Sequence, residues 1–375
     1  MPIRLLQIIP LHDSYRVFLR ELTDSLRASG HDVLTLCHMG NGNSVEPIAG
    51  QEDNCLDFTI PRGAQPLKHF FAAQSLRQFI AHYRPTHIHA HFSAAILTAA
   101  LARTPEHKNI QWFGTFQGLQ FPYCKGLKGW LTRQAECFAA SRLDKVWVLT
   151  DDDAKQLRNH APKANCLRQQ SPGFGINDRF LDTPPVSSAD RTTLRARLGI
   201  PESATVFVFI GRLVQFKGFH LAAHAIFKAT QARSDIHWIV IGERDPLHPC
   251  GLSDSEWTQF EEHPSIHWLK TQSDVLPWLD ASDALLFPTK REGMPVSVME
   301  SLARRKPVLT FNIRGCRELI HPPKNGRYFA AETVDAIVDE ILRFTPFTFA
   351  PPNELRRGHW IQEMHSAYGV EVASS

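Results

Sequence analysis

Residues 206–218 read Val-Phe-Val-Phe-Ile-Gly-Arg-Leu-Val-Gln-Phe-Lys-Gly, an apolar run that ends at a glycine and passes into a cationic loop. A short apolar run bounded by a turn signal predicts a buried strand. Such runs alternate with helical segments along the whole chain, which indicates an α/β fold with mostly parallel sheets. The other expected strands are residues 3–9, 33–36, 86–90, 110–113, 145–149, 238–241, 266–269, 284–287 and 307–310.

The length of 375 residues favours two domains, because single hydrophobic cores stop growing at about 250–300 residues. Pro, Ser and Thr gather in residues 181–192, which predicts a linker there. We therefore expect Rossmann-like domains at residues 1–180 and 193–340, and a tail at 341–375 that is rich in proline and then helical. Two such domains would face each other across a cleft, with ligands at the carboxyl ends of their strands.

Composition narrows the class of protein and its compartment. The net charge of +3 suits an anionic ligand or a membrane surface but is too small to indicate nucleic-acid binding. Seven cysteines without a C-x-x-C pair argue against a disulfide framework and favour a reducing compartment. The N-terminal run lacks the features of a signal peptide, and no apolar run reaches the ~20 residues needed to span a bilayer. We expect a cytoplasmic protein, or one that lies on the inner face of a membrane.

The loop after the strand at 206–210 carries the first candidate site. Arg212 can grip phosphate oxygens with its planar fork, and Lys217 adds a point charge. The helix that follows offers free N–H groups and the positive end of its dipole. This combination favours a diphosphate ligand. The alternative is a surface loop with two solvated cations.

The second candidate site is residues 290–303, Lys-Arg-Glu-Gly-Met-Pro-Val-Ser-Val-Met-Glu-Ser-Leu-Ala. The carboxylate of Glu300, on the expected helix, could accept both hydroxyls of a ribose. Glu292, beside exposed backbone N–H groups, could hold sugar hydroxyls. The alternative is a capping box, Ser297-x-x-Glu300, in which Glu300 only satisfies its own helix end. Pro295 also suits the first position of that helix.

Taken together, the two segments resemble retaining glycosyltransferases of family 4, which have the GT-B fold. The family pattern G-R-L-x-x-x-K-G corresponds to Gly211–Gly218, and E-G-x-P-x-S-x-x-E corresponds to the start of Glu292–Val308. Weaker matches support the same resemblance at residues 30–33, 85–91, 173–177, 314–320 and 325–326. The resemblance covers roughly residues 3–330. Within the family, the chain is most similar to the subgroup that builds bacterial surface polysaccharides.

The resemblance implies roles for individual residues. Arg212 and Lys217 would hold the donor diphosphate, Glu300 the ribose, and Glu292 the transferred sugar. The implied donor-binding set is Gly211, Arg212, Lys217, Glu292, Gly293, Met294, Pro295, Ser297, Val298 and Glu300, with Glu292, Arg212 and Lys217 as catalytic residues. Preorganised cations would stabilise the leaving diphosphate, so no metal and no other cofactor is expected. No general base is assigned.

The acceptor is expected on loops of the first domain, near Asp13, His91, Gln117 and Gly118. The chain departs from the family there. The frequent T-x-H-G sequence is Thr-Phe-Gln-Gly at 115–118, and glutamine cannot shuttle a proton near neutral pH. The loop at 11–15 lacks the usual glycine pair. These departures leave open a catalytically inactive protein that binds nucleotide sugars.

Two further departures lie in the second domain, where arginines stand at positions that are often glycine. Arg305 follows the helix at 295–304, and a left-handed conformation there would cost roughly 1 kcal/mol. Arg244 stands where a second glycine often follows Gly242.

Three other patterns admit competing interpretations. His87, His89 and His91 alternate along a strand and so share one face, which would suit a metal-dependent hydrolase. Asp-Asp-Asp at 151–153 could bind a metal, but its place between a strand and a helix favours a helix cap. Residues 121–147 mix aromatic side chains with lysines and arginines, which fits either an anionic membrane surface or an ordinary exposed helix.

From these observations we expect a retaining hexosyltransferase that uses a nucleoside diphosphate sugar, with a UDP-sugar as the expected donor. Its acceptor would be a glycan or a lipid-linked sugar in the assembly of capsule, lipopolysaccharide or exopolysaccharide. The pathway rests on the family resemblance alone.

Overall fold

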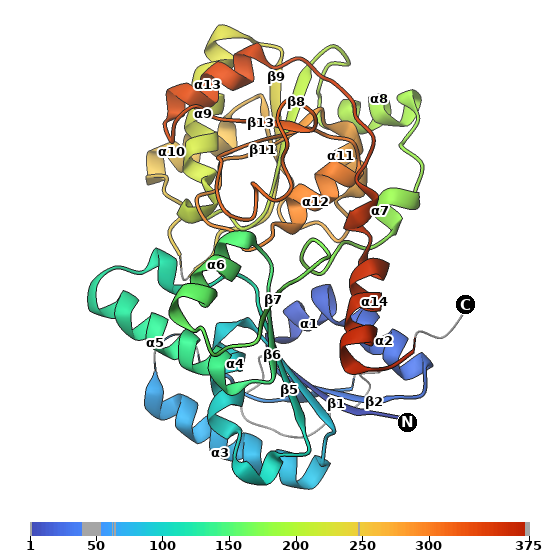
Figure 1. Cartoon of the computed structure of the whole chain (residues 1–375). Coiled ribbons are helices and arrows are strands. Elements are labelled where there is room, and N and C mark those ends of the chain that lie inside the picture. The colour runs from blue at the N-terminus through green and yellow to red at the C-terminus, as the bar shows by residue number, and fades with distance from the viewer. Residues whose placement is uncertain (1, 40–53, 62, 64, 247, 372–375) are drawn as a thin grey trace. The chain divides into compact units, whose positions relative to one another are not determined.

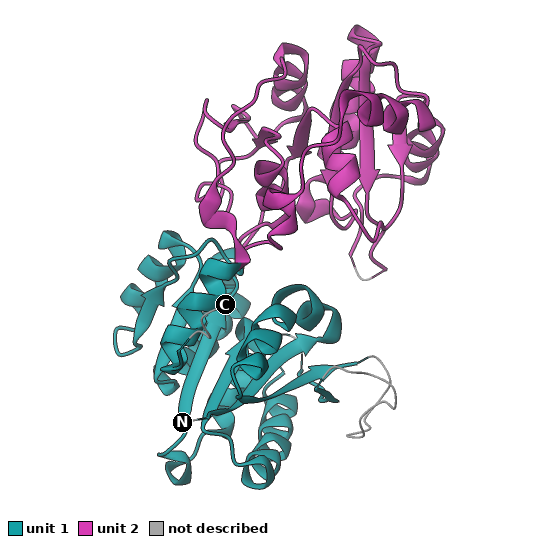
Figure 2. Ribbon diagram, turned by 90° about the vertical axis from the view of Figure 1, so that its right-hand side faces the viewer, with its two compact units in different colours: residues 1–174, 358–375 teal, residues 175–357 magenta. Residues whose placement is uncertain are grey.

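The computed structural model describes residues 2–39, 54–61, 63, 65–246 and 248–371. The chain forms two compact units, one of residues 1–174 with 358–375 and the other of residues 175–357 (Figure 2). The units divide at residue 174, a few residues before the expected end of the first domain at 180. The segment expected to be a separate tail, residues 341–375, is divided between the units: residues 341–357 belong to the second unit and residues 358–375 to the first.

The first unit is built on a seven-stranded parallel sheet with the order β3-β2-β1-β4-β5-β6-β7. Strand order reverses between β1 and β4, the arrangement of a doubly wound Rossmann-like sheet. The strands are β1 (Arg4–Leu11), β2 (Asp32–His38), β3 (Cys55–Asp57), β4 (His87–His91), β5 (Gln111–Phe116), β6 (Lys145–Val148) and β7 (Cys166–Arg168). Because both faces of the sheet are buried, the longer strands have continuous apolar sequences instead of alternating apolar and polar residues.

Helices cover both faces of this sheet (Figure 1). One face packs against α3 (Pro66–Tyr83), α4 (Phe92–Ala102), α5 (Gly126–Arg142) and α6 (Asp151–His160). The other packs against α1 (His12–Phe18), α2 (Arg20–Ala28) and α14 (Arg357–Tyr368). Short 3₁₀ turns lie at η1 (Pro105–His107) and η2 (Phe121–Tyr123). The buried ring of Trp360 on α14 meets Phe174 with centroids 4.8 Å apart, which ties the end of the chain to the first unit.

The second unit has a six-stranded parallel sheet with the order β10-β9-β8-β11-β12-β13, again reversing at its centre. Its strands are β8 (Thr205–Ile210), β9 (Ile236–Ile241), β10 (Ile266–Trp268), β11 (Ala284–Phe287), β12 (Val308–Thr310) and β13 (Gly326–Tyr328). Helices α9 (Phe219–Ala232), α10 (Asp254–Glu262) and α13 (Val334–Arg343) pack on one face. Helices α7 (Arg179–Asp182), α8 (Ser188–Arg197), α11 (Leu276–Ala281) and α12 (Val296–Ala303) pack on the other. Two 3₁₀ turns, η3 (Gln215–Lys217) and η4 (Asn353–Leu355), complete the unit.

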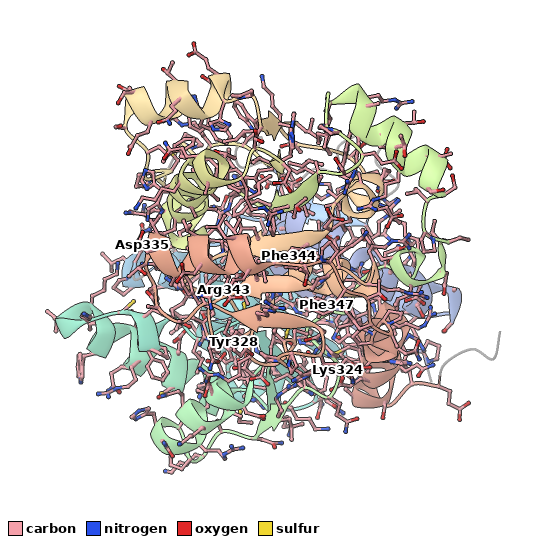
Figure 3. The ribbon with its side chains drawn as sticks, turned by 90° about the horizontal axis from the view of Figure 1, so that it is seen from above. Lys324, Tyr328, Asp335, Arg343, Phe344 and Phe347 are labelled. Atoms are coloured by element: carbon pink, nitrogen blue, oxygen red, sulfur yellow. The ribbon has the colours of Figure 1, made fainter. Side chains whose placement is uncertain are left out.

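A single hydrophobic core fills the second unit. Helix α13 closes it: Asp335 and Arg343 lie on this helix, and Phe344 follows it (Figure 3). The ring of Phe344 is buried and meets that of Phe207 with centroids 5.3 Å apart. This packing fixes β8, the strand whose carboxyl end carries the first candidate site.

All the expected strands are present, and the described residues form three more, β3, β7 and β13. Each of these three strands has three residues of which one is charged, so none of them is an apolar run. The segment between β1 and β2 forms two helices, α1 and α2, with a break at Leu19. Among the described residues no helix is long and apolar enough to cross a membrane.

Candidate active site

The candidate site of the second unit lies at the switch point of its sheet. The loop after β8 and the loop after β11 leave the carboxyl ends of two neighbouring strands. Ligands of open α/β sheets bind at this place. All ten residues predicted to bind the donor belong to these two loops or to the helix α12 that follows β11.

A glycine allows the two loops to touch. Gly218 has φ of +74°, ends η3 and begins α9. A Cβ atom at this position would lie 1.8 Å from the carbonyl oxygen of Pro288, so only glycine fits. Beside this contact the backbone N–H of Lys290 donates to the carbonyl oxygen of Phe216 at 2.9 Å. Backbone contacts therefore join the two loops of the predicted site, and this fixes the positions of the side chains on both loops.

Lys217 and Glu292 meet across these loops. The Nζ atom of Lys217 donates to Oε1 of Glu292 at 2.6 Å. Thr289 donates from its Oγ1 to the same carboxylate oxygen at 2.9 Å. Only 8% of the Glu292 side chain and 20% of the Lys217 side chain are exposed. The structure thus brings together the predicted diphosphate-binding lysine and the predicted sugar-binding carboxylate as a partly buried ion pair.

Arg212 is engaged by a different carboxylate. Its Nη1 atom donates to Oδ2 of Asp245, which lies in the loop after β9. The guanidinium also lies over the ring of Phe216, 5.4 Å from its centroid. The Nδ1 atom of His248 is 3.3 Å from the same oxygen of Asp245. An anion that bound both Arg212 and Lys217 would therefore replace two carboxylate partners.

Backbone contacts also support the segment from Glu292 to Pro295. Gly315 has φ of +83°, and a Cβ atom there would lie 2.5 Å from the carbonyl oxygen of Gly293. The buried Arg314 donates from Nε to the carbonyl oxygen of Glu292 at 3.4 Å. Residues 314 and 315 belong to a segment that matches the family pattern but was given no role. In the structure both residues contact the loop after β11 and support it.

The capping interpretation of Glu300 is wrong. Helix α12 begins at Val296 with Pro295 as its N-cap, and no side chain caps it. Ser297 is therefore the second helical residue rather than the cap, and Pro295 precedes the first helical position instead of occupying it. Desolvation raises the pKa of Glu300 to about 8, and the charges of Arg179 and Arg357 only partly offset this shift. Glu300 is thus a desolvated carboxyl that does not serve its own helix end.

A cavity of about 450 Å³ adjoins the loop after β8. Residues from the ends of β8, β9 and β10 line it, among them Gly211, Arg212, Gly242, Arg244 and Gln272. Gly242 has φ of +137°, and a Cβ atom there would lie 1.9 Å from the carbonyl oxygen of Gly211. Arg244, which replaces a frequent glycine, is exposed and lies over the ring of Trp257, 4.7 Å from its centroid. The cavity has the size of a site for part of a small molecule.

The residues predicted for the acceptor follow neighbouring strands of the first sheet. Asp13 lies in α1 directly after β1, His91 ends β4, and Gln117 and Gly118 follow β5. Because β1, β4 and β5 are adjacent, these positions share the carboxyl edge of the sheet. Asp13 is exposed, Gln117 is half-buried and His91 is fully buried.

Two buried carboxylates hold the loop that carries Gln117. Glu136 accepts from the backbone N–H groups of Gln120 and Phe121, at 3.0 and 3.1 Å. Asp153 accepts from the backbone N–H of Leu119 at 3.4 Å. Sequence reasoning missed both roles, because each carboxylate is distant in the sequence from the loop that it supports.

The histidines of β4 form a packed cluster instead of the metal site considered above. Both ring nitrogens of His89 are occupied, by the hydroxyl of Tyr368 at 2.6 Å and by that of Thr115 at 2.8 Å. His91 stacks on His89 with centroids 4.1 Å apart, and burial lowers the pKa of His91 to about 3. Within the part of the chain that the structure describes, no group of three or more His, Cys, Asp or Glu side chains could hold a metal ion.

The three aspartates at 151–153 form the first turn of α6. The cap itself is the preceding residue, Thr150, whose hydroxyl accepts from the backbone N–H of Asp153. The acidic residues suit the positive end of the helix dipole. The helix-end interpretation is confirmed, with the cap one residue earlier than expected.

Each unit matches one family model. Residues 15–169 match the model described as glycosyl transferase 4-like domain, and residues 204–345 match the model described as glycosyl transferases group 1. Together the two matched segments span most of the chain.

Curated relatives are glycosyltransferases of low sequence identity. The N,N'-diacetylbacillosaminyl-diphospho-undecaprenol alpha-1,3-N-acetylgalactosaminyltransferase of Campylobacter jejuni is 24% identical over 287 residues, which cover 73% of this chain and 71% of the relative. The UDP-Gal:alpha-D-GlcNAc-diphosphoundecaprenol alpha-1,3-galactosyltransferase of Escherichia coli is 24% identical over 151 residues, 40% of this chain and 38% of the relative.

Solved structures share the whole fold. Sucrose-phosphate synthase from Thermosynechococcus elongatus aligns with a TM-score of 0.75 and 17% identity over 98% of both chains. HepE from Anabaena, solved in complex with UDP and glucose, aligns with a TM-score of 0.73 and 14% identity over 98% of this chain and 99% of that chain. The chain is a glycosyltransferase of the GT-B type, with a glycosyl transferase 4-like domain in its first unit and a glycosyl transferases group 1 domain in its second.

Proposed function

We propose that this glycosyltransferase is a retaining hexosyltransferase. It moves a hexose from a nucleoside diphosphate sugar, with a UDP-sugar as donor, to a glycan or lipid-linked acceptor in surface polysaccharide assembly. The observation that carries the proposal is the ion pair of Lys217 and Glu292 at the switch point of the second sheet. The cation that would bind the diphosphate and the carboxylate that would bind the sugar are joined there by one hydrogen bond.

The donor would lie along the loops of the second unit. Arg212 and Lys217 would bind the diphosphate, and Glu300 would accept hydrogen bonds from the ribose hydroxyls. The cavity beside Gly211 and Gln272 has room for the base. Glu292 and the backbone of Gly293 to Pro295 would bind the transferred hexose.

The chemistry then needs charge stabilisation. The bond between C1 of the hexose and the diphosphate oxygen breaks, and the electron pair leaves with the diphosphate. Arg212 and Lys217 stabilise that negative charge, a contribution that preorganised groups make without a metal. The acceptor hydroxyl attacks C1 on the face that the diphosphate leaves, and its proton passes to the departing phosphate.

The proposed acceptor class draws on the relatives' names. Both the Campylobacter jejuni and the Escherichia coli enzymes are named for diphospho-undecaprenol acceptors. On the first unit, Asp13, His91 and Gln117 follow three neighbouring strands and would contact the acceptor sugar or orient the transferred one.

The anomeric configuration of the product, measured by NMR, tests retention.

A thermal-shift and calorimetric panel tests the donor part of the proposal. The ligands are UDP, GDP, ADP, TDP and CMP, each with and without EDTA. We expect stabilisation by UDP that EDTA does not change. Absence of a response to every nucleotide, together with destabilisation by EDTA, would contradict the proposal.

A further inference from the structure

Three hydrogen-bond donors converge on one buried carboxylate of the first unit. Glu136 lies on α5, and its Oε1 atom accepts from the hydroxyl of Ser93 and from the backbone N–H of Gln120. Its Oε2 atom accepts from the backbone N–H groups of Gln120 and Phe121, each at 3.1 Å. Ser93 lies in the first turn of α4, and the other two donors lie in the loop after β5. The carboxylate therefore joins the start of α4 to that loop.

The hydrogen bonds of Glu136 favour its ionised form. All three partners donate, and a protonated carboxyl would have to turn its own proton towards one of them. Burial raises the pKa of Glu136, and the hydrogen bonds from the three donors partly offset this shift. The negative charge of Asp153 also raises that pKa, although Asp153 is itself engaged with the backbone N–H of Leu119. Because ionised acceptors form the stronger hydrogen bonds, Glu136 holds its partners firmly.

The groups that Glu136 holds are close in sequence to residues predicted for the acceptor. Ser93 follows His91 by two positions. Gln120 follows Gln117 by three positions. Strands β4 and β5, which end beside these residues, are paired in parallel, and α4 packs against α5 (Figure 1). One side chain thus fixes two of the predicted acceptor positions with respect to each other.

The backbone between His91 and Ser93 is strained. Phe92 has φ of +71°, a positive value that a side chain with a Cβ atom disfavours. Strain of this kind persists only where neighbouring contacts hold it. The hydrogen bond from the hydroxyl of Ser93 to Glu136 is such a contact, because it holds the residue that follows Phe92. Loss of this hydrogen bond would let the turn relax and would move His91.

The loop after β5 is held along its backbone, while the side chain of Gln117 is left to a ligand. The Nε2 atom of Gln120 donates to the carbonyl oxygen of Gly118 at 3.1 Å. Among the residues that the structure describes, none forms a hydrogen bond with the buried Nε2 atom of Gln117. The same is true, within that part of the chain, of both ring nitrogens of the buried His91. Buried polar atoms are normally hydrogen-bonded, so these nitrogens are suited to the hydroxyls of a sugar.

We propose that Glu136 is a positioning residue of the transfer reaction, which holds Gln117 and His91 in the geometry that the sugars require. The inference rests on the proposed function, in which these two side chains contact the acceptor sugar or orient the transferred one. Glu136 acts through the loop backbone and through Ser93 instead of through the sugars. The nucleotide is assigned to the second unit, so its affinity should not depend on Glu136.

The test compares Glu136→Gln with a matched control, Asp144→Asn. Glu136→Gln keeps the size of the side chain but replaces one oxygen with an NH₂ group, which cannot accept from the backbone N–H groups of the loop. Asp144 accepts from the backbone N–H of Trp112 at 2.8 Å, near the start of β5. The two variants therefore neutralise carboxylates that hold opposite ends of the same strand. Ser93→Ala is a milder second variant, which keeps Glu136 and removes one of its donors.

Turnover is measured as release of UDP from UDP-glucose, UDP-galactose and their two N-acetylhexosamine counterparts, and affinity by calorimetry with UDP. We expect kcat for the best of these donors to fall about hundredfold in Glu136→Gln, the effect of a small misplacement near the reacting groups. The fall should be smaller in Ser93→Ala. Affinity for UDP should match that of wild type in all three variants, and kcat should also match in Asp144→Asn.

A double variant separates positioning from a general loss of structure. If Glu136 acts through Gln117, the losses of kcat in Glu136→Gln and Gln117→Ala should combine to less than their product. Hydrogen exchange gives a second measure that needs no turnover. In Glu136→Gln the amides of residues 118–121 should exchange faster, while those of the second unit keep the wild-type rates.

The inference is overturned if wild type turns over a donor and Glu136→Gln has the same kcat. Losses of kcat that multiply fully in the double variant, or a loss of UDP affinity that accompanies them, would also overturn it, because either indicates a general structural role. If Glu136→Gln does not fold, Ser93→Ala decides, and an unchanged kcat in that variant overturns the inference. A wild type that releases UDP from none of the four donors would contradict the proposed function itself, and the inference would fall with it.

Discussion

The Nζ atom of Lys217 lies 2.6 Å from Oε1 of Glu292, although the two residues are 75 positions apart in the sequence. Each belongs to a loop at the switch point of the second sheet, and the glycine at position 218 lets those loops touch. In the proposed function, the pair joins the lysine that would bind the diphosphate of the donor to the carboxylate that would bind its sugar.

Replacement of Glu292 should separate the binding of nucleotide from the binding of sugar. Glu292→Gln removes the carboxylate that neutralises Lys217, so the lysine becomes available to a phosphate. We expect UDP to bind several-fold more tightly while turnover of the UDP-sugar falls about hundredfold, the usual effect of one lost electrostatic contact. Calorimetry and steady-state kinetics measure the two effects. The matched control is Glu332→Gln, whose carboxylate pairs with Lys290 of the same loop, and it should change neither.

Asp245 is expected to compete with the donor for Arg212. Its carboxylate accepts a hydrogen bond from the guanidinium. Asp245→Asn should therefore tighten UDP binding, by about 1 kcal/mol, the upper range for a partly exposed ion pair. Titration calorimetry of UDP measures this change. Weaker binding would instead mean that Asp245 orients Arg212 for the phosphate, and Asp335→Asn, which breaks the remote pair with Lys228, serves as the control.

The pH dependence of UDP affinity should identify Glu300. Its pKa of about 8 means that it is protonated at neutral pH in the folded protein. Ribose hydroxyls donate best to the ionised form, so the affinity of wild type relative to Glu300→Gln should rise between pH 6.5 and 9, a range set around that pKa. Pyrophosphate, which has no ribose, should bind both proteins alike at every pH. An equal effect on pyrophosphate would place Glu300 at the phosphates.

The same pKa has a consequence for stability. A carboxyl whose pKa is about 8 in the folded state and 4.5 in its ordinary state binds more protons when folded, over the range between these values. Its contribution to stability is therefore present at low pH and is lost as the pH rises towards 8. Glu300→Gln should remove this component, so its free energy of unfolding should fall less than that of wild type between pH 5 and 8, the range given by the shift. Parallel curves would show that Glu300 is not desolvated.

Arg305 is expected to be strained. It is exposed and has φ of +58°, a left-handed conformation that a side chain with a Cβ atom disfavours. Arg305→Gly should raise the free energy of unfolding by about 0.5–1 kcal/mol. Urea denaturation measures the change. Arg305→Ala keeps the Cβ atom and should bring no gain, and an equal gain from both variants would show that the backbone is not the cause.

Gly218 should tolerate no side chain. Gly218→Ala would put a Cβ atom 1.8 Å from the carbonyl oxygen of Pro288, and the loops after β8 and β11 would have to separate. We expect a loss of stability of more than about 3 kcal/mol, with loss of UDP binding. Gly199→Ala is the control, since Gly199 also has a positive φ but its Cβ position is open. That variant should lose only about 1 kcal/mol and bind UDP normally.

The sequence predicted the architecture because the long strands carry their signal locally. Runs such as 206–210 are apolar on both faces, since helices cover both sides of each sheet. Strands β3 and β13, whose three residues include a charged one, form by pairing with a neighbour rather than by their own pattern. The packing of α14 on the first unit depends on contacts of Trp360 with residues nearly two hundred positions earlier. No local signal encodes such a contact.

The candidate site was predictable in its composition but not in its pairing. Arg212, Lys217, Glu292 and Glu300 stand in short patterns that can be read locally. The contact of Lys217 with Glu292, and the engagement of Arg212 by Asp245, depend on how three strands are ordered. The capping box at Ser297 was the wrong interpretation because α12 begins two residues earlier than that pattern requires.

The measurement that tests the central claim most directly is release of UDP from a UDP-sugar, in EDTA, by wild type and by Lys217→Ala. Lys228→Ala, an exposed lysine on α9, is the control. We predict turnover by wild type and control without a metal, and a fall of about hundredfold in kcat for Lys217→Ala. Turnover that requires a divalent metal, or turnover that Lys217→Ala leaves unchanged, would contradict the account.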